Sequence, residues 1–89
     1  MKSILTVIGK DQVGIIAGIS TELGKFNINI LNVNQTIMDG NFTMIMMLDQ
    51  TEANASFEEV KKALAVKGEE LRVDIKIQRE DIFTKMHSL

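Results

Sequence analysis

The stretch VIGKDQVGIIAGIS, which covers Val7–Ser20, joins an apolar run to a helix-like pattern through a loop that contains glycine. Before the loop, apolar side chains lie on both faces of a predicted strand at about Lys2–Ile8. After it, apolar residues recur at helical spacing and predict a helix over about Val13–Lys25. The predicted buried stripe of this helix is Ile15, Ile16, Ile19, Leu23 and Phe26. A strand that passes directly into a helix indicates a fold that mixes both kinds of element.

Two further strands and a hairpin follow this unit. Residues at about Ile28–Met38 form a predicted strand whose apolar and polar side chains alternate from Leu31 onward. The Asp-Gly pair in MDGN, Met38–Asn41, favours a tight hairpin turn with positive backbone φ angles. The next predicted strand, at about Phe42–Leu48, carries apolar side chains on both faces. These two strands are therefore expected to be neighbours in one sheet.

A second helix and a fourth strand complete the pattern. Ser56, with Glu59 three residues later, matches a capping box that opens the helix. Gly68 fits a left-handed cap at the C-terminal end of this helix. The last strand, at about Leu71–Gln78, alternates cleanly between apolar and polar residues. The element order is therefore β-α-β-β-α-β.

The four predicted strands differ in their number of apolar faces, and this difference predicts their order in the sheet. The strands at Lys2–Ile8 and Phe42–Leu48 are apolar on both faces and belong in the middle. The other two have one polar face and belong at the edges. The result is an α+β, ferredoxin-like sandwich with antiparallel strand order 4-1-3-2 and two helices on one face. The opposite face is expected to expose apolar side chains, which usually marks a contact surface.

The composition excludes several classes of function. The 89 residues suffice for one domain, and a net charge of −2 without a basic cluster argues against a nucleic-acid partner. No apolar run approaches the roughly 18–20 residues that span a membrane, and the first residues lack a signal-peptide pattern. The chain has no cysteine, so a cytoplasmic location is the expectation. The single histidine, His87, stands apart from other ligand types, and we expect no metal, cofactor or catalytic group.

One segment, GKDQVGIIAGISTELGKFNINILNVNQT, resembles the ACT domain, a small-molecule-sensing module attached to many enzymes of amino-acid metabolism. The resemblance rests on Asp11, then Gly14 at the start of the helix, then the Asn29–Ile30 pair at the start of the next strand. Many family members have proline where this chain has Val13, and glycine where it has Asn27. The order and the spacing of the motif are otherwise kept.

The resemblance implies an ACT domain over residues 2–78 and a C-terminal tail over residues 79–89. The whole chain is similar to stand-alone bacterial ACT proteins of the same size, which are related to the ACT halves of the glycine-cleavage regulator. Apolar residues in the tail recur at helical spacing and predict a short helix that packs at a dimer interface; they are Ile82, Phe83 and Met86. The family implies a non-catalytic regulatory protein that binds an amino acid.

The candidate ligand site combines the glycine loop with the start of the second strand. Free N–H groups at the first turn of the helix favour a carboxylate, and glycine lets that group approach the backbone. An acid in the loop can accept from an ammonium group, and an asparagine can both donate and accept. The resemblance places this asparagine beside the loop of a neighbouring subunit. The candidate ligand-binding residues are Asp11, Gln12, Val13, Gly14, Asn29 and Ile30.

Simpler roles for these residues stay open at this point. Asp11 is also a favoured N-cap of a helix, and Asn29 is able to bond its own turn. Gly14 and Gly18 form a bare strip on one helix face. We favour close approach of a ligand or a partner backbone to this strip, with packing of the helix on the sheet as the alternative.

Three functions are compatible with these observations. The first is a homodimeric regulator that binds an amino acid, and the second is an interaction protein without a ligand. The third is an acylphosphatase-like hydrolase, because acylphosphatases share this size and topology and hold phosphate in a glycine-containing loop. That chemistry needs an arginine beside the loop. The two arginines here, Arg72 and Arg79, are remote in sequence, and Lys10 replaces a bidentate guanidinium poorly.

The dimer can form in two ways. Stacked sheet faces would cover the apolar side of the sheet, and paired strand edges would use the strand at 28–38, which has no proline and no charge. We favour stacking, because the strand at 42–48 has no polar side; its apolar residues include Met44, Ile45, Met46 and Met47.

Overall fold

A computed structural model describes residues 1–81 of the chain. The predicted helix of the tail, with Ile82, Phe83 and Met86, lies outside the described residues. Neither of the two helices within the described part is long and apolar enough to cross a membrane.

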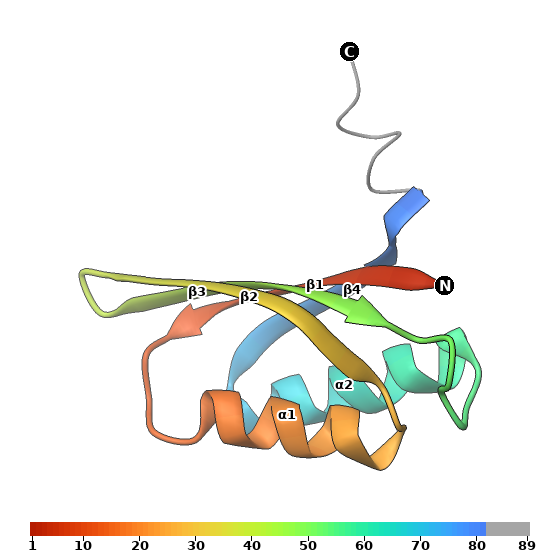
Figure 1. Ribbon diagram of the computed structural model, residues 1–89. Helices are drawn as coiled ribbons and strands as arrows, with labels where there is room; N and C mark the ends of the chain where they lie inside the picture. Colours follow the sequence, from red (N-terminus) through yellow and green to blue (C-terminus); the bar gives the residue numbers. More distant parts are fainter. Residues whose placement is uncertain (82–89) are drawn as a thin grey trace.

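The fold is a four-stranded sheet with two helices on one face (Figure 1). Its elements are β1 (Lys2–Lys10), α1 (Ile15–Lys25), β2 (Asn29–Met38), β3 (Asn41–Asp49), α2 (Phe57–Leu71) and β4 (Val73–Arg79). The sheet order is β2-β3-β1-β4, with all neighbouring strands antiparallel. The ferredoxin-like arrangement and the strand order predicted from the sequence are confirmed.

The core lies between the sheet and the helices. Alternate residues of β3 are buried there, and Ile45 on the opposite face is 47% exposed, so the two apolar faces of this strand have different environments. One member of the predicted stripe of α1, Ile16, is exposed rather than buried. The buried residues that β3 and the two helices contribute are Phe42, Met44, Met46, Leu48, Ile15, Ile19, Leu23, Val60 and Leu64.

The predicted start of α2 is confirmed, and its predicted end is wrong. The Glu59 N–H donates to the Ser56 Oγ over 3.2 Å, as expected for a capping box. The helix does not stop at Gly68 but continues to Leu71, and Arg72 adopts the left-handed conformation with φ 59°. A Cβ at Gly68 would lie 2.9 Å from the carbonyl oxygen of Val73. This glycine therefore permits close packing of α2 on β4, which sequence periodicity cannot indicate.

The two edges of the sheet differ in charge. On β4, Asp74 and Lys76 are exposed charged residues, which protect an edge from pairing. On β2, all ten residues are uncharged, and the exposed large apolar side chains are Leu31, Val33, Ile37 and Met38. The β2–β3 hairpin has the positive φ angles predicted for the Asp-Gly pair, and an extra residue at Leu31 makes a bulge in β2.

Candidate functional site

The loop at residues 11–14, here called the Gly14 loop, joins β1 to α1. Gly14 immediately precedes the helix, with φ 95° and ψ 0°, a conformation that favours glycine. A Cβ built on Gly14 would meet nothing within 4 Å, so the space beside this backbone is open. No side chain caps the first N–H groups of α1. These groups are therefore available to an anion.

Asp11 does not cap α1, so this alternative role is wrong. Its backbone N–H donates to the carbonyl oxygen of Gly40 over 2.8 Å, which ties the Gly14 loop to the turn between β2 and β3. Within residues 1–81, its exposed carboxylate makes no hydrogen bond and no ion pair. The carboxylate is thus free to accept from a ligand at the mouth of the loop.

Gln12 makes a long-range contact that the sequence did not indicate. Its Nε2 donates to the carbonyl oxygen of Leu71, the last residue of α2. The side chain therefore holds the Gly14 loop against the end of α2, while the neighbouring Val13 is fully exposed. Gln12 and Leu71 are 59 residues apart, and no local pattern links them.

Gly18 is needed for contact between the two helices. A Cβ at this position would lie 3.1 Å from Leu71 Cδ1. The sequence favoured approach of a ligand or a partner backbone here, with packing on the sheet as the alternative. The structure instead places the Leu71 side chain of α2 against Gly18, so the open part of the glycine strip is limited to Gly14.

Asn29 and Ile30 lie at the other end of α1 from Gly14 (Figure 1). The 11 residues of α1 separate the two ends by about 16 Å, at 1.5 Å per residue. Asn29 opens β2 and pairs with Asp49 across the ladder. Of the predicted residues, 11–14 lie together and 29–30 lie together. The two groups do not meet within one chain.

Asn29 lines a cavity of about 270 Å³, here called the Asn29 cavity. The residues that line it are Gly24, Asn27, Ile28, Asn29 and Glu52. Asn27, in the left-handed conformation, donates through Nδ2 to the carbonyl oxygen of Glu52 over 3.0 Å. Within the described chain, the side chain of Asn29 makes no hydrogen bond. The alternative role of Asn29 in bonding its own turn is therefore not seen.

Charged groups of both signs lie near the Asn29 cavity, and the Met1 ammonium donates to the Thr51 Oγ1 over 3.1 Å. The Asp49 carboxylate accepts from the Thr51 Oγ1 over 2.6 Å and from the Thr51 N–H over 2.9 Å. These hydrogen bonds hold the pKa of Asp49 below its usual value, and the bond from the Thr51 side chain has the larger effect. This carboxyl group is therefore ionised near neutral pH. The Lys25 ammonium lies 3.8 Å from the Glu22 carboxylate. Glu52 makes no ion pair with any residue from 1 to 81.

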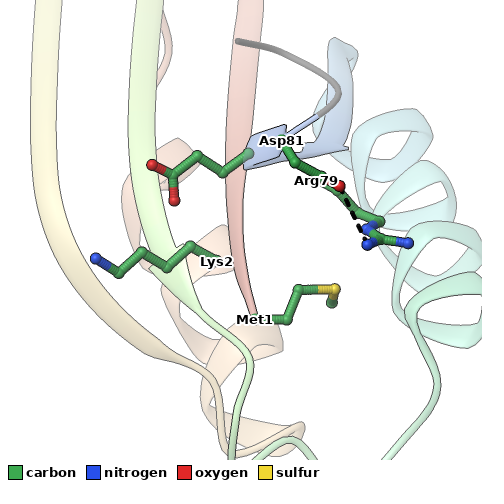
Figure 2. A pocket seen from close by; sticks show the side chains of 5 residues that line it. Met1, Lys2, Arg79 and Asp81 are labelled. Carbon is green, nitrogen blue, oxygen red and sulfur yellow. Dashed lines mark hydrogen bonds and ion pairs between the residues drawn. The ribbon is translucent and has the colours of Figure 1, made fainter. Parts of the chain in front are cut away.

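A cavity of about 580 Å³, larger than the Asn29 cavity, lies elsewhere (Figure 2). Its lining includes Met1, Lys2 and an ion pair of 3.3 Å between Arg79 and Asp81. Nine residues of β1 separate it from the Gly14 loop by roughly 30 Å, at about 3.3 Å per residue. No predicted site residue lines it. Among residues 1–81, no group of three or more His, Cys, Asp or Glu residues is arranged to hold a metal ion.

Comparisons with known proteins agree with the fold. A family model described as the ACT domain matches residues 3–78. A UPF0237 protein of Listeria monocytogenes is 60% identical over 89 residues, which cover 100% of both chains. The structure of an ACT domain protein from Streptococcus pneumoniae matches with a TM-score of 0.82 at 36% identity and covers 93% of each chain.

A more distant structure shares the fold alone. It is described as a putative glycine cleavage system transcriptional repressor, and it matches at 17% identity with a TM-score of 0.74, over 86% of this chain and 44% of that one. The domain match includes both the Gly14 loop and the start of β2. The chain belongs to the ACT domain family, among the stand-alone UPF0237 proteins.

Proposed function

We propose that this protein is a cytoplasmic, non-catalytic regulator that binds an amino acid as a homodimer. ACT domains are small-ligand-binding regulatory modules. The observation that carries the proposal is Gly14, where a positive φ angle, open space and uncapped N–H groups coincide. Asp11, in the same loop, supplies a free carboxylate. The free N–H groups can bind the carboxylate of an amino acid, and the neighbouring Asp11 carboxylate can bind its ammonium group.

The second half of the site comes, in this proposal, from a second copy of the chain. Asn29 and Gly14 lie at opposite ends of α1, and a single chain cannot bring them to one ligand. The resemblance to the family supports a position for this asparagine beside the loop of a neighbouring subunit. The dimer must therefore bring the start of one β2 to the Gly14 loop of the other copy.

Antiparallel pairing of two β2 edges meets this requirement. Around a two-fold axis, the start of one β2 lies beside the end of the other. The end of β2 adjoins the turn whose Gly40 carbonyl accepts from Asp11. The Gly14 loop thus comes close to Asn29 of the partner subunit. Stacked sheet faces, which we favoured from the sequence, leave the helices on the outside and keep these groups apart. We therefore propose edge pairing.

A thermal-shift screen of the twenty amino acids tests the proposed function. A ligand at one hundred times its dissociation constant adds about 2.7 kcal/mol to the free energy of unfolding. For a domain of this size we expect a rise in Tm of about 10–20 °C. Acetate and glycerol at equal concentration serve as controls for effects that are not specific. If none of the twenty raises Tm, amino-acid binding is wrong and an interaction protein without a ligand takes its place.

We also expect no acylphosphatase activity. The loop that would hold the phosphate carries Lys10 rather than an arginine, and Arg79 lies at the end of β4. Arg72 follows Leu71, whose carbonyl oxygen accepts from Gln12, so this arginine lies near the Gly14 loop but belongs to the cap of α2 rather than to the loop itself. Purified protein incubated with acetyl phosphate should therefore release phosphate no faster than buffer. Turnover that disappears in the Lys10→Ala variant would contradict this expectation and would favour the hydrolase.

A further inference from the structure

The Asn29 cavity is slightly smaller than a usual small-molecule site. Its volume of about 270 Å³ lies just under the range of about 300–1,000 Å³ that is usual for small-molecule sites. Its polar lining comes from Asn27, Asn29 and Glu52. Asn27 is already bonded to the Glu52 carbonyl oxygen, so the side chains of Asn29 and Glu52 are the ones left for a ligand.

The carboxylate of Glu52 is the group in this cavity that can bind a cation. The cavity lies where α1 ends, but the last carbonyl groups of the helix are already bonded: the Lys25 oxygen accepts from Asn54 Nδ2 over 2.9 Å, and the Gly24 oxygen accepts from the Asn27 N–H over 3.1 Å. Glu52 makes no ion pair with any described residue, and the nearby Met1 ammonium donates to Thr51 Oγ1 over 3.1 Å instead. Lys25, the basic residue of the last turn, lies near Glu22 instead. The Oδ1 atom of Asp49 accepts both hydrogen bonds from Thr51.

We propose that Glu52 binds the ammonium group of the amino acid whose carboxylate lies on the Gly14 loop of the other protomer. This inference rests on the proposed function and on edge pairing of β2. An ammonium group has three N–H donors, and three acceptors then surround it: Asp11 from one protomer, with Asn29 and Glu52 of the partner subunit. The consequence is specificity, because the site selects amino acids over 2-oxo acids that have the same side chain but no ammonium group.

The first test compares the effects on ligand binding of neutralising two exposed glutamates, Glu52 and Glu58. The probes are each of the twenty amino acids and, for any that binds, the matching 2-oxo acid, both measured by calorimetry. For wild type we expect binding of the amino acid and none of the 2-oxo acid. Glu52→Gln should weaken amino-acid binding about 10–100-fold, because a charge-assisted hydrogen bond is lost. The control Glu58→Gln, in the exposed first turn of α2, should bind as wild type does.

The second test asks whether the two halves come from different chains. Gly14→Asn keeps a residue that tolerates positive φ and fills the open space beside the loop, so this variant alone should not bind. The two variants, Gly14→Asn and Glu52→Gln, are mixed in equal amounts, unfolded and refolded together. Half of the resulting dimers then contain one chain of each variant. Each mixed dimer has one intact site out of two, so about one quarter of the wild-type sites should return. Each variant refolded alone serves as the control.

The outcomes separate the two proposals. If wild type binds no amino acid, the proposed function fails and this inference fails with it. If wild type binds but Glu52→Gln binds equally well, or the 2-oxo acid binds as tightly, the inference alone is overturned. If both variants lose binding and their mixture regains none, Glu52 does not act across the dimer, and the inference is again overturned.

Discussion

Replacing Phe42 with alanine is expected to lower the free energy of unfolding by about 3–5 kcal/mol. Among the described residues, Phe42 is the largest fully buried side chain, and it lies in the core between β3 and the helices. Its removal loses apolar burial and leaves a cavity that close-packed neighbours fill only in part. Because dimer stability depends on concentration, urea unfolding should be followed at one fixed protein concentration. The change corresponds to a fall in Tm of more than about 12 °C.

Val66→Ala is the control for this prediction. Val66 lies on α2, away from the β2 edge, and is 56% exposed. Truncation of this apolar side chain should therefore cost less than about 1 kcal/mol. Equal losses for the two variants would contradict the location of the core described here.

Replacing Val33 with lysine is expected to convert the proposed dimer into a monomer. Val33 lies near the middle of β2, so edge pairing around a two-fold axis brings both new ammonium groups close together. Like charges facing one another across an interface cost several kcal/mol, and the dissociation constant should rise about 100-fold or more. Light scattering at micromolar concentration should then report the 9.9 kDa chain in place of twice that mass.

Ile45→Lys distinguishes edge pairing from stacked sheets. Ile45 is 47% exposed and Val33 is 44% exposed, but Ile45 lies on the sheet face that the helices leave open. Edge pairing predicts that Ile45→Lys remains a dimer. A monomeric Ile45→Lys together with a dimeric Val33→Lys would show that the sheets stack, and the composite site would be wrong. A wild-type protein that is monomeric would contradict both arrangements.

Much of the fold was determined by the sequence alone, because the relevant signals are local or periodic. Apolar residues on both faces assigned β1 and β3 to the centre of the sheet, and Asp39–Gly40 specified the hairpin turn. Ser56 and Glu59 marked the start of α2, because the two residues of this hydrogen bond are only three positions apart in the sequence. The Asp11 and Gly14 pattern likewise identified the loop and the family, because this short motif is enough to indicate each of them.

The tertiary structure decided the contacts between residues that are distant in sequence. Gly68 resembles a helix cap locally, but its role is set by the carbonyl of Val73, against which α2 packs. Gln12 resembles a ligand contact, yet its amide bonds the end of α2. Such partners are chosen by how helices and strands pack in space, which a linear pattern does not encode.

The same reason explains the division of the candidate site. The sequence supplied both Gly14 and Asn29, but the length of α1 holds them apart, because a hydrogen-bonded helix cannot fold back on itself. Glu52 had no sequence signal at all; it reaches Asn29 only because the loop after β3 returns to the end of α1, where Asn27 bonds its carbonyl. The motif thus determined which residues are candidates, and the rigid helix between them decided that the two groups of candidates lie apart within one chain.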